Sequence, residues 1–230
     1  MIRFVLFDLD NTILNFDAGE EKALDETLRS YGLTPSPDII SRYQEINDEL
    51  WRMLEEGRTT REILSVERFS RLFSEFSIAC PGEEAAARYA ELLSHQHPFM
   101  PGAEEVLSRL HGSYALYIAS NGTSWIQWRR IKDAGLEKWF DDIFISEELG
   151  ANKPDPAFFE KAFEGMEDFR KEEAVIIGDS LTSDIKGGLN AGIHTCLFAP
   201  GKLPERPDIR PEYTVRSLFE IPGLLEKIQT

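Results

Sequence analysis

Five short apolar runs, separated by helical patterns, constrain the fold of this chain more than any other feature. They are nearly continuous, rich in β-branched and aromatic residues, and span 2–7, 114–119, 142–145, 174–177 and 195–198. Strands that are buried on both faces of a parallel sheet have this composition. Helical patterns occupy 103–110, 125–134, 156–163 and 184–191. Residues 200–211, rich in proline and charge, are expected to form a surface loop before a last short strand at 213–215. The alternation of strands and helices predicts an α/β fold with a doubly wound parallel sheet.

One long stretch, residues 17–96, breaks this alternation. It shows only helical periodicity, with apolar residues recurring at intervals of three and four. Gly32, Gly57 and Pro81-Gly82 divide it into about four helices. We therefore expect a Rossmann-like core formed by 1–16 and 97–230, with a small all-helical cap domain inserted after the first strand.

Composition excludes several classes of protein. The chain has 230 residues, with 41 acidic and 25 basic side chains and a net charge of −16, which disfavours a nucleic-acid or anionic-membrane surface. No apolar run approaches the roughly 20 residues of a membrane span, and no signal peptide is visible, so a cytoplasmic location is expected. The two cysteines, Cys80 and Cys196, lack metal-ligand spacing, and a chain of this length does not need a disulfide to fold.

Polar side chains follow several of the predicted strands at the point where each strand ends. Asp8 and Asp10 follow the first strand, Ser120-Asn121-Gly122 follows the second, and Asp179 follows the fourth. The carboxyl ends of parallel strands share one edge of a sheet, where ligands bind. Carboxylates gathered there repel one another unless a hard cation such as Mg²⁺ neutralises them. Alternatively, each acid on its own could cap a helix or close a turn.

The ordered set of motifs resembles the four-motif pattern of the haloacid dehalogenase-like hydrolases. The motifs are Asp8-Leu9-Asp10-Asn11-Thr12, Ser120-Asn121-Gly122, Lys153-Pro154, and Gly178-Asp179 with Asp184 five residues on. The helical insert resembles the first type of cap in that superfamily. The segments 145–150 and 183–192 are similar to a bacterial branch of pyrimidine 5′-nucleotidases.

The resemblance implies a role for each motif residue. Asp8 would be the nucleophile, and Asp10 would serve as general acid and base while its backbone carbonyl binds metal. Asp179 would complete the protein's share of a Mg²⁺ shell, which would thus comprise Asp8, Asp10 and Asp179, with Asp184 supporting it. Lys153 would be catalytic, and together with Ser120 it would hold phosphoryl oxygens. The remaining expected substrate-binding positions are Thr12, Asn121, Gly122 and Phe16.

The helical insert gives weaker indications. Arg58, Arg61 and Arg68 are candidates for meeting a phosphate or a base, although most arginines at such positions bind no substrate. Trp51 of the insert, and Trp125 and Trp128 outside it, could stack on a nucleobase, but packing is the better explanation of tryptophans at helical spacing.

These residues favour a Mg²⁺-dependent phosphomonoesterase that acts through an aspartyl phosphate on a small phosphorylated metabolite, with a pyrimidine nucleoside 5′-monophosphate as the expected substrate. Alternatives are a phosphatase of another metabolite, such as a sugar phosphate or phosphoglycolate, a phosphomutase, a haloacid dehalogenase and a non-catalytic binding protein. A halide leaving group has no use for Asp10, and unused buried carboxylates are unfavourable to hold together. Both a monomer and a dimer remain open.

Overall fold

The computed structural model describes residues 1–201 and 208–228, and within them six parallel strands form one sheet. The strands are β1 (Phe4–Phe7), β2 (Ala115–Ser120), β3 (Asp142–Ile145), β4 (Ala174–Gly178), β5 (His194–Phe198) and β6 (Tyr213–Val215). Their order is β3-β2-β1-β4-β5-β6, so β1 lies between β2 and β4. The chain winds outward in both directions from β1, which confirms the predicted doubly wound parallel sheet.

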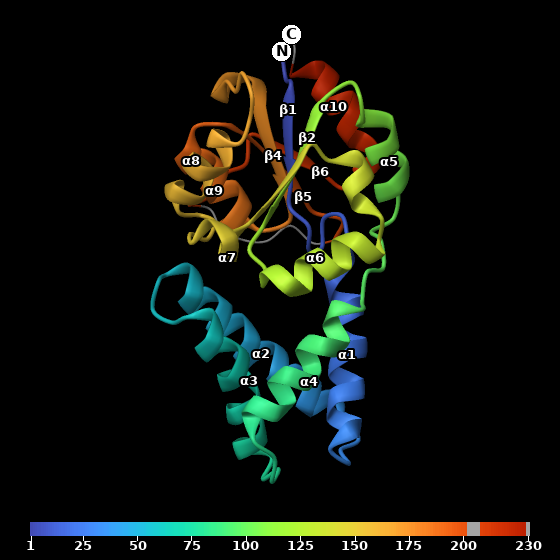
Figure 1. Ribbon diagram of the computed structural model, residues 1–230, viewed down its shortest axis with the longest axis vertical. Coiled ribbons are helices and arrows are strands. Elements are labelled where there is room, and N and C mark those ends of the chain that lie inside the picture. The colour runs from blue at the N-terminus through green and yellow to red at the C-terminus, as the bar shows by residue number, and fades with distance from the viewer. Residues whose placement is uncertain (202–207, 229–230) are drawn as a thin grey trace. The chain divides into compact units, whose positions relative to one another are not determined.

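Helices cover both faces of this sheet (Figure 1). The helices of this part of the chain are α5 (Ala103–Leu110), α6 (Ser124–Asp133), α7 (Ser146–Leu149), α8 (Pro156–Glu164), α9 (Lys186–Ala191) and α10 (Ile221–Lys227). Short 3₁₀ turns lie at Leu136–Trp139, Lys171–Glu173 and Leu218–Glu220. In Figure 1, α5 and α10 lie on one side of the sheet, while α8 and α9 lie on the other.

Alternate residues of each strand supply two separate cores. Val5 and Phe7 of β1 pack with apolar residues of α5 and α10, whereas Phe4 and Leu6 pack with those of α8 and α9. The side chains of β1 are all buried, as the continuous apolar runs predicted. Because helices cover both faces of the sheet, polar side chains that could bind a ligand are expected at the edge where the strands end.

Residues 17–96 form a separate helical unit. Its helices are α1 (Phe16–Ser30), α2 (Pro37–Glu55), α3 (Arg61–Glu75) and α4 (Gly82–Ser94). By contacts, one compact unit holds Met1–Phe16 and His97–Thr230, and the other holds Asp17–Gln96. Ser36 and Thr60 accept hydrogen bonds from the third residue of α2 and α3, so the polar residues between these helices serve as N-caps.

The helix expected at 184–191 differs from prediction at its start. A π-helical turn, Leu181–Ile185, precedes α9, and Ser180 caps it by accepting a hydrogen bond from the backbone of Ser183. Asp184 therefore lies inside the turn and is not the N-cap of α9. The surrounding apolar residues, including Leu181 and Ile185, are buried, so this turn is packed against β5.

Three other expectations can be compared with the structure. Of the loop expected at 200–211, positions 202–207 lie outside the described residues, and Ile209 is buried rather than exposed. Cys80 and Cys196 are both free thiols. In the described part of the chain, no helix combines the length and the apolar character that a membrane crossing requires.

Candidate functional site

The ends of the three central strands bring the predicted motif residues together. Asp8 follows β1, Ser120 ends β2, and Asp179 follows β4. Since β1 pairs with both β2 and β4, these residues occupy the point at which the winding of the sheet changes direction. Such a point is where open α/β sheets bind ligands.

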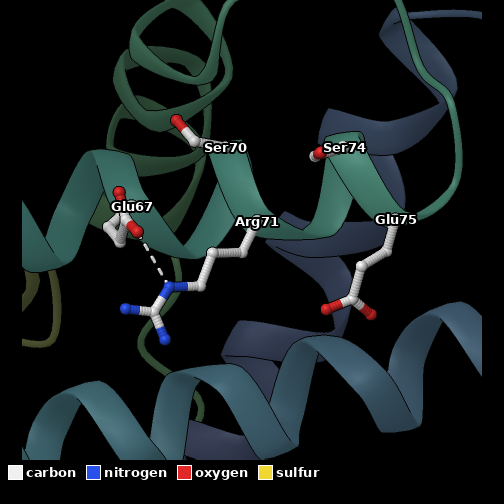
Figure 2. Close-up of a pocket in the computed structure, with 5 residues that line it drawn as sticks. All are labelled: Glu67, Ser70, Arg71, Ser74 and Glu75. Atoms are coloured by element: carbon white, nitrogen blue, oxygen red, sulfur yellow. Dashed lines mark hydrogen bonds and ion pairs between the residues drawn. The ribbon is translucent and has the colours of Figure 1, made fainter.

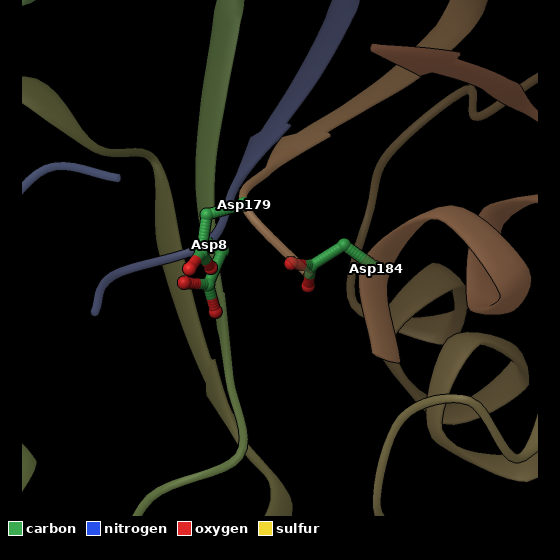
Figure 3. A group of neighbouring side chains, drawn as sticks. All are labelled: Asp8, Asp179 and Asp184. Atoms are coloured by element: carbon green, nitrogen blue, oxygen red, sulfur yellow. The ribbon is translucent and has the colours of Figure 1, made fainter. Parts of the chain in front are cut away.

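Three carboxylates form the centre of the site. An oxygen of Asp8, one of Asp179 and one of Asp184 all lie within 4.8 Å of one another, and Figure 3 shows the Asp184 side chain directed toward the other two. The pKa of Asp8 is raised to about 7, mainly by burial. The charge of Lys153 lowers this pKa, whereas the charges of Asp184 and Asp10 raise it further. Burial and the charge of Asp8 likewise raise the pKa of Asp179 well above its usual range.

This donor set suits a divalent cation. Each raised pKa reflects burial first and the neighbouring carboxylates second, so the ionised forms are unfavourable here without a neutralising charge. A hard cation with oxygen ligands, such as Mg²⁺, supplies that charge. Asp8 and Asp179, both predicted ligands, belong to the group, and so does Asp184, which was expected to support from nearby. The side chain of Asp10, by contrast, lies outside it.

Lys153 contacts two of these carboxylates and is fully buried. Its Nζ donates to Oδ1 of Asp8 at 2.7 Å and to Oδ1 of Asp184 at 2.6 Å, and it also donates to the carbonyl oxygen of Ala119. Burial alone would lower the pKa of Lys153, but the charges of Asp184 and Asp8 outweigh that effect and raise it. The ammonium group therefore stays charged and cancels part of the carboxylate charge.

The carboxylate of Asp10 is held by two residues of α6. Nη1 of Arg130 lies 2.6 Å from Oδ1 of Asp10, and Nε2 of Gln127 donates to Oδ2 at 2.7 Å. Both side chains are almost completely buried. The sequence analysis did not single out either residue. Their spacing of three, which places them on one face of a helix directly after the second motif, is the signal that could have identified them.

Each of the three residues of the second motif makes a different structural contact. Ser120 is buried, and its Oγ accepts a hydrogen bond from Gln127 at 2.8 Å. Asn121 exchanges two hydrogen bonds of 2.8 Å with the backbone of Lys153, which fixes the loop that carries this lysine. A Cβ on Gly122 would lie 2.2 Å from Cγ of Gln127, so only glycine leaves room for that side chain.

The first motif continues into a tight turn. Asn11 has a φ of 57°, a left-handed conformation that asparagine tolerates, and backbone bonds from Ile13 and Leu14 to Leu9 close the turn. Thr12 is fully buried, and its hydroxyl has no hydrogen-bond partner among the residues that the structure describes. Phe16 lies with its ring centroid 5.6 Å from the guanidinium carbon of Arg130.

The arginines of the helical unit lie in different environments. Arg58 is exposed and pairs with Glu56. Arg61 lies with its guanidinium 5.9 Å from the ring of Trp51. Arg68, in contrast, is buried with its guanidinium 4.4 Å from the ring of Tyr89, inside the helical unit.

A shallow pocket on α3 is lined by residues of the helical unit (Figure 2). Its lining residues are Glu67, Ser70, Arg71, Ser74 and Glu75. Arg71 binds Glu67 at 2.8 Å, and Glu75 binds Arg42 at 2.7 Å. These charges already neutralise one another, and no motif residue lies among them, so the strand-end cluster remains the candidate active site.

Comparison with known proteins identifies a matching family. A model of the haloacid dehalogenase-like hydrolase family matches residues 2–192. The chain is 40% identical to HAD-hydrolase YfnB of Bacillus subtilis, over 97% of this chain and 95% of that protein. It is also 40% identical to pyrimidine 5′-nucleotidase PynA of Streptococcus pneumoniae (98% and 95% covered) and 31% identical to pyrimidine 5′-nucleotidase YjjG of Escherichia coli (97% and 98% covered).

Solved structures agree as well. The crystal structure of YfnB, described as bound to magnesium, has a TM-score of 0.93 over 97% of this chain and 98% of that one. The L-2-haloacid dehalogenase of Xanthobacter autotrophicus shares the fold, with a TM-score of 0.80 at 17% identity over 99% of each chain. The family match, the full-length relatives and the arrangement of the four motifs lead to one conclusion: this chain belongs to the haloacid dehalogenase-like hydrolases.

Proposed function

We propose that the chain is a Mg²⁺-dependent phosphomonoesterase that forms an aspartyl phosphate on Asp8. The observation that carries the proposal is the position of Asp8, which lies within the carboxylate cluster and 2.7 Å from Nζ of Lys153. A nucleophile that attacks a phosphate dianion needs positive charge close by. Lys153 supplies one such charge from the protein itself.

The residues divide the chemistry among them. The Asp8 carboxylate attacks phosphorus, and the bond from phosphorus to the leaving oxygen breaks. Asp10 gives its proton to that oxygen, then takes one from the water that hydrolyses the acyl phosphate. Ser120 and Lys153 hold phosphoryl oxygens, and Asn121 and Gly122 shape the loop that presents Ser120. Inorganic phosphate and free Asp8 are the products of the second step.

The carboxylate set would hold the metal ion. Asp8 and Asp179 would bind Mg²⁺ through side-chain oxygens and Asp10 through its backbone carbonyl, with Asp184 supporting them. When bound, the ion would neutralise charge shared by the carboxylates and the phosphoryl group. Thr12 and Phe16, beside the first motif, are proposed to contact the substrate.

Pyrimidine nucleoside 5′-monophosphates are the proposed substrates. PynA and YjjG, which match the chain over nearly its full length, are named for that activity. We propose that residues 17–96 act as a cap that limits the site to a small phosphorylated metabolite.

Other reactions of the same fold are less well supported. A dehalogenase would have no use for the carboxyl group of Asp10, which Arg130 and Gln127 hold at the site. A phosphomutase would need groups that keep water from the aspartyl phosphate. A phosphatase of a sugar phosphate or phosphoglycolate remains the second candidate. The motif residues are proposed to contact only the phosphate, so they do not distinguish among the organic groups attached to it.

Removal of metal provides the first test. Dialysis against EDTA is expected to remove phosphatase activity, and added Mg²⁺ is expected to restore it, because the repulsion among Asp8, Asp179 and Asp184 is then neutralised. The measurement is phosphate release together with the melting temperature, which should rise with Mg²⁺ through binding to the folded state. Full turnover in a sample verified as metal-free would contradict the proposal.

A panel of phosphomonoesters provides the second test. We expect kcat/KM for dUMP or dTMP to exceed that for hexose phosphates and phosphoglycolate by about ten-fold or more, a preference of about 1.4 kcal/mol. Phosphate release from each compound at matched enzyme concentration measures the ratio. If a hexose phosphate or phosphoglycolate exceeds every nucleotide by that margin, the nucleotide assignment is wrong and the phosphatase assignment stands.

A further inference from the structure

We propose that Gln127 and Arg130 of α6 are positioning residues that clamp the carboxyl group of Asp10 for proton transfer to the leaving group. This inference rests on the proposed function, because it assigns a purpose to the residue that serves there as general acid and base. Neither side chain belongs to the four motifs, and both act through Asp10.

The clamp is a closed network of hydrogen bonds. Nη1 of Arg130 donates to Oδ1 of Asp10 at 2.6 Å and to Oε1 of Gln127 at 2.8 Å. Nε2 of Gln127 donates to Oδ2 of Asp10 at 2.7 Å and to Oγ of Ser120 at 2.8 Å. Each oxygen of Asp10 is thus held from a different side chain, which fixes the plane of its carboxyl group.

This arrangement still leaves Asp10 able to move a proton. Each carboxylate oxygen can accept two hydrogen bonds, and the clamp uses one on each oxygen. Among the residues that the structure describes, no further donor is bound to either oxygen, which leaves a second acceptor position on each for a proton in transit. Gln127 also ties Ser120 to the same network, so the phosphoryl-binding hydroxyl and the proton-transfer group are positioned together.

The start of α6 is itself held in place by α7. The Glu147 carboxylate accepts a hydrogen bond of 2.7 Å from the backbone nitrogen of Ser124, at the helix start. Glu148 accepts one from the Ser124 hydroxyl and one of 2.7 Å from Nε1 of Trp128. These contacts fix the end of α6 on which Gln127 lies, and Gly122 keeps the space that its side chain fills.

The leaving group provides the readout. An alkyl phosphate requires a proton on the departing oxygen, whereas p-nitrophenyl phosphate needs little. We expect Arg130→Met to lower kcat/KM for the best alkyl phosphate of the panel by roughly 10- to 100-fold, the scale of a misplaced catalytic group. For p-nitrophenyl phosphate the loss should be less than about three-fold. Lys132→Met, which removes an exposed charge from the same helix, is the matched control and should match wild type on both compounds.

The Asp10→Asn background separates a clamp from a general structural role. Asp10→Asn alone should show the alkyl-selective loss, and adding Arg130→Met to it should produce no further selectivity. Arg130→Lys, which keeps the charge without the rigid fork, should recover part of the alkyl activity. If Arg130→Met does not fold, judged by circular dichroism, Arg130→Lys and Gln127→Met carry the same comparison against wild type.

Two results would overturn the clamp inference while leaving the proposed function intact. These are an equal loss on both substrates in the Arg130 variants, or the same selectivity with and without Asp10. If Asp10→Asn itself shows no selectivity, the acid–base role of Asp10 fails, and the clamp inference fails with it. If wild type releases phosphate from no compound of the panel, the proposed function is wrong.

Discussion

Replacing Asp8 with asparagine is expected to abolish turnover while the fold remains intact. An amide cannot form the acyl phosphate, so the covalent step has no nucleophile. We expect a loss of roughly 10⁴-fold or more in kcat, the scale seen when a nucleophile is removed. The substitution also takes one negative charge out of a crowded cluster, so it should not unfold the protein in the presence of Mg²⁺.

The proposed covalent intermediate can be tested for directly. Wild type mixed with phosphate-labelled substrate and quenched in acid should carry label on the peptide that contains Asp8, and Asp8→Asn should carry none. Asp133→Asn, an exposed aspartate at the end of α6, is the matched control and should retain wild-type activity. Appreciable steady-state turnover in freshly prepared Asp8→Asn and Asp8→Ala would contradict the aspartyl-phosphate mechanism.

The parts of the fold that were predictable depend on local pattern. The expected strand at 142–145 has the bounds of β3, and the expected helix at 103–110 has those of α5. In both elements, the faces that are buried determine where apolar residues occur, and this spacing is visible in a single sequence. The predicted start of α9 was wrong because a π-helical turn precedes this helix. That turn depends on hydrogen bonds from the local backbone to the side chains of Ser180 and Asp184, which the spacing of apolar residues does not reveal.

The residues of the site also divide into those that local pattern predicts and those that only tertiary contacts place. Asp8 and Asp179 could be placed at one edge from the strand ends alone, since parallel strands align their carboxyl ends. Arg130 could not be placed in this way, because an arginine on a helix is normally solvated and its sequence neighbours carry other charges. The spacing of Gln127 and Arg130 could have marked them as candidates, but the tertiary contact with Asp10, 120 positions away, is what places Arg130 at the site.

Lys153→Met is expected to lower both stability and turnover by large amounts. The ammonium group lies fully buried between Asp8 and Asp184, and removing it leaves both carboxylates without their cation. Breaking a buried ion pair in this way costs about 3–5 kcal/mol. Turnover should fall by roughly 10³-fold, because the proposed donor to the phosphoryl group in the transition state is lost as well.

Thermal or urea unfolding and phosphate release, each measured with and without Mg²⁺, separate these two effects. Mg²⁺ should restore part of the lost stability, because an ion held by the proposed ligand Asp8 would neutralise its charge. It should restore little of the turnover, because Mg²⁺ would not replace Nζ of Lys153 in its proposed role beside the phosphoryl oxygens. Lys161→Met is the control, since Nζ of Lys161 donates to the carbonyl oxygen of Leu149 at the surface and contacts no carboxylate of the site. A Lys153→Met protein as stable as wild type without Mg²⁺ would show that Asp8 and Asp184 do not depend on this lysine for neutralisation.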